Sequence, residues 1–197
     1  MSNRLIIGLT GSTGSGKSEV SRLLASKGCH VVDADKLAHR VTEKGSPALS
    51  RIAERFSAAV LCEDGTLNRA ELAKRAFATP QDTADLNAIV HPAVIELMKQ
   101  EIARSQSRVI VLDVPLLFQS GTDALCDTTV AVTAPPAVRE ARICKRDGLT
   151  TEQAQWRMQA QPSDAYYAER ATHVIVNDGT YEDLVQRVET LCAEGFV

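Results

Sequence analysis

Short apolar runs alternate with longer segments of mixed polarity along the chain. Within the runs the apolar residues are continuous, which is typical of strands whose sheet is covered on both faces. We predict five strands, at residues 4–10, 30–35, 108–114, 128–134 and 173–177. Their alternation with helical segments predicts an α/β fold, in which helices cover both faces of a parallel five-stranded sheet.

The segments between these runs carry apolar residues at helical spacing. They predict helices at residues 17–27, 36–43, 47–56, 69–77, 81–105, 136–147, 150–161 and 181–194. Gly28 is placed to end the first helix, and Pro92 marks a start or a kink within the long segment 81–105. Because residues 36–105 contain helices but no expected strand, we predict a helical subregion beside the sheet.

A glycine-rich segment separates the first predicted strand from the first predicted helix. It matches G-x-x-x-x-G-K-[ST] in full, and a strand before it and a helix after it are the context that this motif requires. Its eight residues are Gly11, Ser12, Thr13, Gly14, Ser15, Gly16, Lys17 and Ser18. In such a loop, backbone N–H groups and a helix N-terminus surround a phosphate chain, and the lysine reaches the β- and γ-phosphates. The motif predicts binding of a nucleoside triphosphate, with ATP the expected one.

Two residues are candidates for holding Mg²⁺ beside the triphosphate. The Ser18 hydroxyl stands at the motif position that ligates this ion. Asp113 lies in the strand predicted at 108–114, near its end, where a carboxylate can hold Mg²⁺ through water. A cap on a helix or turn before Pro115 explains Asp113 equally well, so both interpretations stand.

Residues outside the loop bear on what is done with the nucleotide. A GTPase would carry N-K-x-D near the fourth or fifth strand, whereas HVIVNDG (173–179) has the asparagine without the lysine. A small-molecule kinase needs a carboxylate on the acceptor side and cations that stabilise the transferring phosphoryl group. Candidates for both are present, which favours a kinase over a regulatory nucleotide-binding module, because such a module needs neither.

The candidate carboxylates are Asp33 and Asp35, at the end of the second predicted strand. In an extended chain residues i and i+2 point to the same side, and ligands of parallel α/β sheets bind beyond the carboxyl ends of the strands. One of the two could accept the proton of an acceptor hydroxyl as a general base. Alternatively, at least one caps the next helix, and Asp35, directly before KLAHRV, is well placed to do so.

The candidate cations lie in the predicted helix 136–147. Arg139, Arg142 and Arg146 are spaced to share one face, and Arg157 lies on the following helix. Like charges on one face repel one another until an anion reaches them, so we expect a mobile lid, at about 139–161, that closes over the triphosphate. An ordinary solvated basic face is the alternative, and the phosphate loop in the same chain favours the lid.

Length and composition narrow the class of protein. The chain has 197 residues, which suits one domain, and its net charge of −3 does not favour nucleic acid as a partner. No apolar run is long enough to span a membrane, and no signal peptide is visible. Five scattered cysteines without a CxxC pair indicate a reducing compartment, so we expect a cytoplasmic protein with no membrane partner. No feature of the sequence fixes an oligomeric state.

Motifs along nearly the whole chain resemble those of one family, the dephospho-coenzyme A kinases. The similar segments are IGLTGSTGSGKS, VVDADKLAHRV, GSPAL, DGTLNRAELAKRAF, LNAIVHPAV, DVPLLFQSG, RICKRDGLTTEQAQWRMQAQ and HVIVNDG. The chain departs from the family at Ser12-Thr13, where Gly-Ile is usual, and at Gln119, where Glu is usual. We expect positions 12 and 13 to contribute mainly backbone, and we assign Gln119 no catalytic role.

The resemblance implies a three-layer α/β P-loop kinase fold in one domain with three parts. These are a core (1–35, 106–135 and 172–197), a helical region that binds coenzyme A (36–105) and a lid (136–171). The implied reaction transfers the γ-phosphate of ATP, with Mg²⁺, to the ribose 3′-hydroxyl of dephospho-coenzyme A. The alternative is another small-molecule or nucleoside monophosphate kinase, and the motifs at 64–77 and 86–94 argue against it.

The resemblance also implies roles for particular residues. Asp35 corresponds to the candidate base, with Asp33 beside it, and Lys17 and Arg142 meet the phosphates. Asn177 would lie near the adenine of ATP. The residues that fall in the motifs lining the acceptor site are Leu67, Arg69 and His91.

Overall fold

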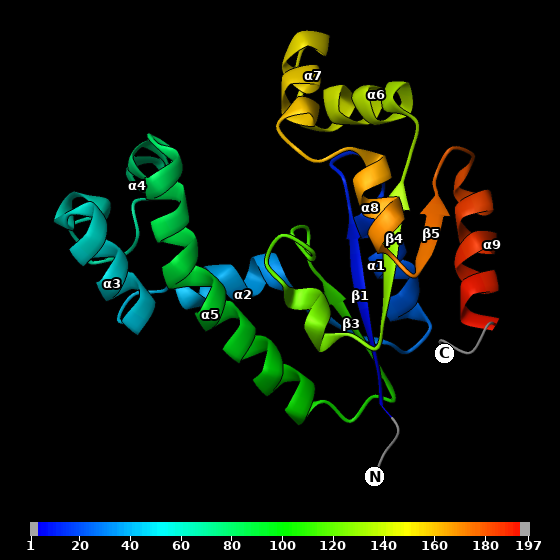
Figure 1. Cartoon of the computed structure of the whole chain (residues 1–197), viewed down its shortest axis with the longest axis horizontal. Coiled ribbons are helices and arrows are strands. Elements are labelled where there is room, and N and C mark those ends of the chain that lie inside the picture. Colours follow the sequence, from blue (N-terminus) through cyan, green and yellow to red (C-terminus); the bar gives the residue numbers. More distant parts are fainter. Residues whose placement is uncertain (1–3, 194–197) are drawn as a thin grey trace. The chain divides into compact units, whose positions relative to one another are not determined.

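A five-stranded sheet forms the centre of the fold in the computed structural model, which describes residues 4–193 (Figure 1). Its strands are β1 (Leu5–Gly11), β2 (His30–Asp33), β3 (Val109–Asp113), β4 (Thr128–Thr133) and β5 (His173–Val176). They lie in the order β2-β3-β1-β4-β5. The pairs β1–β3, β1–β4 and β4–β5 are parallel, with Leu9 opposite both Asp113 and Val130. The predicted parallel α/β sheet is confirmed.

Backbone contacts divide the chain into two compact units. Unit 1 comprises the described residues up to Val32 and from Ser105 onward, and unit 2 is Asp33–Arg104. Unit 1 contains the α-helices α1 (Lys17–Ser26), α6 (Pro136–Asp147), α7 (Thr151–Gln159), α8 (Asp164–Arg170) and α9 (Tyr181–Leu191), and the 3₁₀ helix η2 (Thr122–Leu125). Unit 2 contains α2 (Ala34–Val41), α3 (Pro47–Phe56), the 3₁₀ helix η1 (Ala58–Val60), α4 (Arg69–Ala76) and α5 (Pro80–Arg104).

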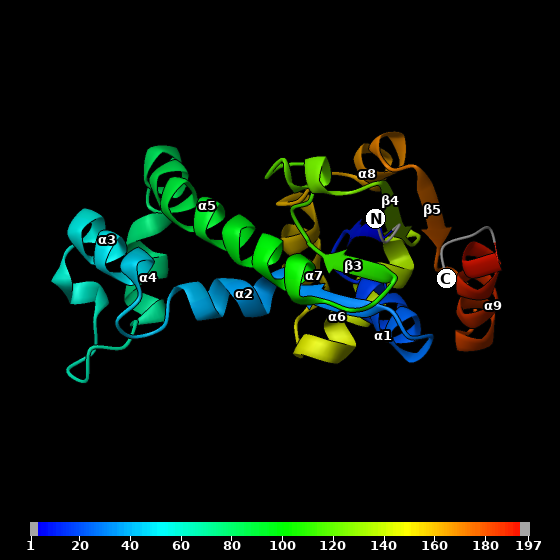
Figure 2. The same ribbon diagram turned by 90° about the horizontal axis from the view of Figure 1, so that it is seen from below.

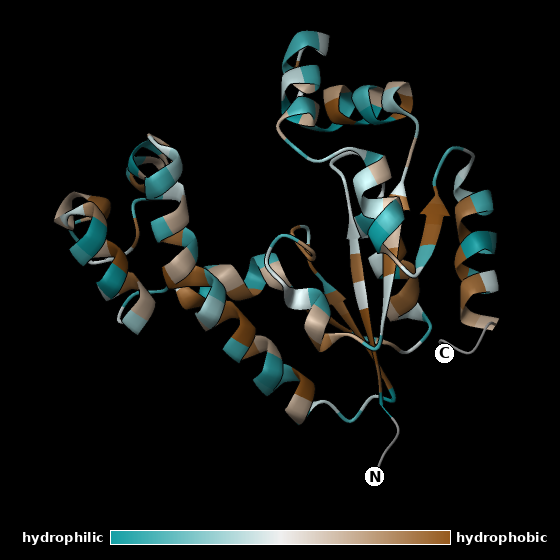
Figure 3. Ribbon diagram, viewed as in Figure 1, coloured by the Kyte–Doolittle hydropathy of each residue, from teal (hydrophilic) through white to brown (hydrophobic). Residues whose placement is uncertain are grey.

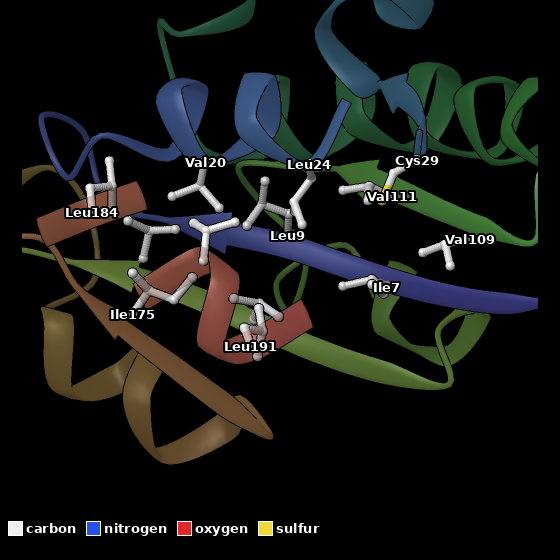
Figure 4. Packing of buried hydrophobic residues seen from close by; sticks show 13 residues of the cluster. Ile7, Leu9, Val20, Leu24, Cys29, Val109, Val111, Ile175, Leu184 and Leu191 are labelled. Atoms are coloured by element: carbon white, nitrogen blue, oxygen red, sulfur yellow. The ribbon is translucent and has the colours of Figure 1, made fainter. Parts of the chain in front are cut away.

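The main core of unit 1 lies between the sheet and two helices, α1 and α9 (Figure 4). Ile7 and Leu9 of β1 are fully buried against Val20 and Leu24 of α1. Figure 3 shows that the strands are largely hydrophobic along their length, as burial on both faces requires. Across the sheet, α8 packs on β4 and β1 and buries Tyr167. The order helix, sheet, helix gives three layers.

Helices α6 and α7 pack on each other beyond the end of β4 (Figures 1 and 2). Gly148, in the left-handed backbone conformation, is the C-cap residue of α6. Helix α7 begins with a capping box between Thr150 and Gln153. Both ends are fixed by short local signals, so α6 and α7 follow the predicted 136–147 and 150–161 closely.

Unit 2 is helical. Helices α2, α3 and α4 each pack on the long helix α5 through a shared apolar core, which includes Leu37, Leu49, Ile52, Leu72, Ile89 and Met98. Pro92 lies inside α5, which runs through it without a break, so a helix start at Pro92 is excluded. No helix within residues 4–193 combines the length and apolarity that crossing a membrane requires.

Four elements differ from the sequence prediction. Strand β2 ends at Asp33, two residues earlier than predicted, because Asp33 caps α2. Helix α8 was not predicted; it has only seven residues, too few for a clear apolar repeat, and Ser163 caps it. The two 3₁₀ helices were not predicted either. Residue 194, the last of the predicted helix 181–194, lies outside the described residues.

Candidate active site

The phosphate loop joins the end of β1 to the start of α1. Gly14 and Gly16 have φ angles of 78° and 94°, a region that side-chain-bearing residues rarely adopt. Gly16 is the N-cap residue of α1, and a Cβ atom there would overlap the Asn177 side chain. The loop therefore needs glycine at position 16 for its backbone conformation and for the close approach of Asn177.

Three consecutive carbonyl groups of the loop accept hydrogen bonds from side chains far along the chain. Arg139 Nε donates to the Thr13 carbonyl at 3.0 Å, and Asn177 Nδ2 donates to the Ser15 carbonyl at 2.8 Å. Arg142 Nη1 lies 3.4 Å from the Gly14 carbonyl and 3.3 Å from that of Ser15. The loop backbone is thus held from outside by α6 and by the residue that follows β5.

Arg142 has only neutral oxygen atoms as partners within the described residues. Besides the loop carbonyls, it donates to the backbone oxygen and to Oδ1 of Asn177, both at 3.2 Å. No carboxylate of the described chain pairs with it. A half-buried guanidinium without a counter-charge, lying against a phosphate loop, is suited to an anionic ligand.

The other two arginines of the predicted basic face have carboxylate partners. Arg139 is 5% exposed, and its Nη1 lies 3.1 Å from Asp164 Oδ2. Arg146 pairs with the neighbouring Asp147, which also accepts from Arg157. The prediction of three charges awaiting an external anion is therefore wrong for Arg139 and Arg146.

Lys17 and Asp113 form an ion pair between the loop and the end of β3. Their side chains are only 16% and 10% exposed. The Asp113 carboxylate accepts a hydrogen bond from the Lys17 ammonium and does not cap a turn. Ser18, the residue after Lys17, is exposed at the start of α1. A hydroxyl and a carboxylate are oxygen donors that suit Mg²⁺, so the chemistry of Ser18 and Asp113 fits the ion that the motif implies.

Asp33 and Asp35 do not share a side of a strand, contrary to prediction. Asp33 Oδ1 accepts from the backbone N–H of Lys36 at 3.1 Å, and this cap starts α2 at Ala34. Asp35 is therefore in the first helical turn, where residues two apart point to nearly opposite sides. Capping by one of the pair is confirmed, with Asp33 rather than Asp35 as the cap. Asp35 is exposed and does not form the N-cap.

The three residues expected at the acceptor site all lie in unit 2. Leu67 forms an isolated bridge with Leu61, just before α4. Arg69 is exposed at the start of α4, with Nη2 3.4 Å from Thr42 Oγ1. His91 is half-buried in α5, and burial lowers its pKa below the usual value for an imidazole.

Sequence reasoning missed a second set of contacts to the loop. Ser12 Oγ donates to Asp164 Oδ1 at 2.5 Å, and the Thr13 N–H donates to Gln161 Oε1 at 2.8 Å. Position 12 was expected to contribute mainly backbone, so its hydroxyl contact corrects that expectation. The sequence signal that could have revealed these contacts is Ser163, which caps α8, because this helix begins with Asp164. Gln119, which was given no catalytic role, donates to the Tyr167 hydroxyl at 3.4 Å.

Comparisons with known proteins identify the family to which the chain belongs. Residues 5–183 match the family model described as dephospho-CoA kinase. The chain is 45% identical over 193 residues to a dephospho-CoA kinase of Syntrophotalea carbinolica, covering 96% of this chain and 91% of the relative. Among solved structures, TT1252 of Thermus thermophilus matches with a TM-score of 0.85 and 37% identity, covering 98% of each chain.

Two further solved structures match the chain less closely. A dephospho-CoA kinase from Campylobacter jejuni matches with a TM-score of 0.70 and 25% identity, covering 96% of each chain. A shikimate kinase from Acinetobacter baumannii has a TM-score of 0.56 at 19% identity, over 98% of this chain and 95% of the other, which shows a shared fold alone. By its family match and its relatives, this chain belongs to the dephospho-CoA kinase family and is a phosphoryl-transferring enzyme.

Proposed function

We propose that this chain transfers the γ-phosphate of ATP to the ribose 3′-hydroxyl of dephospho-coenzyme A, giving coenzyme A and ADP. The observation that carries the proposal is the phosphate loop with Arg142 against it. The guanidinium has neutral partners only, so a triphosphate would supply the negative charge that these partners lack.

Lys17 exchanges one anionic partner for another in this proposal. Its ammonium pairs with Asp113, which keeps the charge paired in a site with little solvent. A triphosphate in the loop draws Lys17 to the β- and γ-phosphates, where it stabilises the charge of the transferring group. Asp113 then regains a free carboxylate.

Ser18 and Asp113 are the residues that would hold Mg²⁺, Ser18 directly and Asp113 through water. When bound, the ion would offset the negative charge that develops on the transferring phosphoryl group. Ser18 is exposed at the helix start, and Asp113 is buried at the end of β3.

Asp35 is the proposed base for the acceptor hydroxyl. Asp33 is occupied by the N-cap of α2, whereas Asp35 is not part of that cap. Phosphoryl transfer is mostly a matter of positioning, so the carboxylate needs to orient the hydroxyl and accept its proton without being a strong base. The caps and packing of unit 2 would keep Asp35 at a fixed place on α2.

Unit 2 is the proposed binding region for the coenzyme A moiety, with Leu67, Arg69 and His91 among its contacts. Arg69 offers an exposed cation for a phosphate of the acceptor, and His91 offers a largely neutral imidazole. We also propose a cytoplasmic setting, in line with five cysteines that are all free thiols.

The test is a product assay with purified protein, ATP, Mg²⁺ and dephospho-coenzyme A, read by mass spectrometry and by phosphorus NMR. The expected product is coenzyme A phosphorylated at the 3′-position. Parallel reactions replace the acceptor by adenosine monophosphate or shikimate, which separates this activity from that of related kinases. ATP turnover with one of these acceptors and none with dephospho-coenzyme A would contradict the proposal.

A further inference from the structure

Arg139, which is buried, and Asp164, which is partly exposed, form an ion pair, and each of the two contacts the phosphate loop. Arg139 donates to the Thr13 carbonyl through Nε while its Nη1 contacts Asp164. The other oxygen of Asp164 accepts from the Ser12 hydroxyl at 2.5 Å. One guanidinium and one carboxylate thus fix two successive loop residues, and neither role follows from the phosphate-loop motif.

The direction of the loop's N–H groups depends on these carbonyl contacts. In a trans peptide unit the C=O and the following N–H point in opposite directions, and the described chain contains no cis peptide. A Thr13 carbonyl that faces Arg139 therefore turns the Gly14 N–H away from α6. In the same way, the Ser15 carbonyl, held by Asn177, turns the Gly16 N–H away from Asn177. Phosphate binding in such loops relies on N–H groups that converge on one point.

Arg139 and Arg142 differ in whether a carboxylate of the described chain neutralises their charge. Arg139 is almost fully buried and its charge is paired with Asp164, so it has little left to offer a phosphate. Arg142 lies one turn further along the same helix face and has no carboxylate partner in the described chain. The two side chains therefore suit different tasks, although the sequence presents them as equivalent.

We propose that Arg139 and Asp164 are positioning residues that hold the phosphate loop in its nucleotide-binding conformation, whereas Arg142 contacts the phosphates. Gln161 assists, because its Oε1 accepts from the Thr13 N–H and so fixes the same residue from the other side. The segment 161–164 thereby makes nucleotide affinity depend on the chain that follows α7. This inference rests on the proposed use of ATP.

The test measures the affinity of a non-hydrolysable ATP analogue by calorimetry, together with KM for each substrate. Asp164→Asn keeps the shape of the side chain but loses the charge that orients Arg139. We expect it to weaken analogue binding and raise the ATP KM by roughly tenfold, with the KM for dephospho-coenzyme A within about twofold of wild type. Asp147→Asn is the matched control, since it breaks two solvent-accessible ion pairs, with Arg146 and Arg157, at the end of the helix that carries Arg139, and should change binding by less than about twofold.

If Arg139 instead contacted the phosphates directly, Asp164→Asn would change analogue affinity in the opposite direction. Removing the charge of Asp164 would then release Arg139, and Asp164→Asn would bind the analogue as well as wild type or more tightly. That result would overturn the proposal, as would a lowered melting temperature with unchanged analogue affinity. If the wild-type protein binds no ATP analogue, the proposed function itself fails first.

A double variant keeps the proposal testable if one single variant is unstable. Arg139→Met should weaken analogue binding by roughly tenfold or more, and adding Asp164→Asn to it should have little further effect, because the two residues hold the loop as one ion pair. Arg139→Lys keeps the charge but cannot donate to Thr13 and Asp164 from one planar group, so it should rescue only in part. Additive losses in the double variant would contradict a shared role.

Discussion

The surroundings of the phosphate loop and the helical unit 2 use charged side chains in opposite ways. At the loop, Lys17 and Arg139 are mostly buried, and their ion pairs join segments far apart in the sequence. In unit 2, Arg55 lies on the surface and bridges Asp82 and Asp85, near the start of α5. Both regions contain ion pairs.

The difference shows that the effect of an ion pair depends on how deeply it is buried and on which other atoms it contacts. Exposed pairs contribute little to stability because water competes for both charges. A buried guanidinium bound to backbone carbonyls instead fixes the direction of neighbouring peptide groups. We therefore expect substitutions at the loop to change catalysis strongly, and substitutions of surface pairs in unit 2 to change it hardly at all.

The largest effect is expected from Lys17→Ala. It removes the cation nearest the β- and γ-phosphates, and loss of such electrostatic stabilisation lowers turnover by roughly a hundredfold or more. Lys27→Ala is the control, because Lys27 is the C-cap residue of the same helix and pairs with Glu189 on the surface. Steady-state kinetics should separate the two variants. Near-wild-type turnover by Lys17→Ala would remove the basis for the phosphate-loop assignment.

Asp35→Asn should lower turnover by about two orders of magnitude, within the range for removal of a general base, while ATP still binds. Asp33→Asn should cost much less, because asparagine caps a helix about as well as aspartate. Parallel assays of both variants, with ATP affinity measured separately, make the comparison. If Asp33→Asn loses activity and Asp35→Asn keeps it, the roles are reversed; if both stay active, the base lies elsewhere or is not needed.

A smaller, spectroscopic change should accompany nucleotide binding. Trp156 is the only tryptophan of the chain, and it is exposed on α7 next to α6, which carries Arg142. We propose that α6 and α7 close over bound nucleotide as a lid, which would change the surroundings of the indole. Its fluorescence should therefore shift on addition of an ATP analogue. An unchanged signal at saturating analogue, in a protein shown by calorimetry to bind it, would count against closure.

The smallest effect is expected from Arg55→Met in unit 2, with kcat and KM within about twofold of wild type. Hydrogen bonds from Thr79 and Gln81, followed by those from Arg55, hold the pKa values of Asp82 and Asp85 below the usual range. A carboxyl whose pKa is lowered by folding stabilises the protein above its unfolded pKa, and this is lost as the pH falls. The small difference in melting temperature between wild type and variant should shrink as the pH falls toward 3. A difference that grows on acidification would contradict this pairing.

The sequence predicts the parts of the site that depend on neighbouring residues. Gly11 to Ser18 could be identified because the strand, the glycines and the helix start are consecutive, and their order fixes the backbone. The boundary at Asp33 was misplaced because an apolar run and a helix cap compete for the same residues. Capping ended the strand two residues early and moved Asp35 onto the helix.

The roles of Arg139 and Arg142 could not be predicted, because they depend on partners elsewhere in the chain. Helical spacing puts both on one face, and only folding brings Asp164 to one and Asn177 to the other. Asp164 lies 25 positions after Arg139, and Asn177 lies 35 positions after Arg142, so these distant residues must meet before the two side chains become different. Helix α8, which carries Asp164, is too short to give a periodic signal.

The long-range contacts of the phosphate loop also order events at the ribosome. Ser15 is synthesised 162 residues before Asn177, the side chain that holds its carbonyl. At roughly 5–20 residues per second, this interval lasts between about 8 and 30 seconds. During that time the whole of unit 2 emerges, and its own contacts, such as Arg40 with Glu101, span 61 residues. The phosphate loop emerges before unit 2 but is completed after it, and a nascent chain should gain affinity for nucleotide only after the residues that follow β5 have left the exit tunnel.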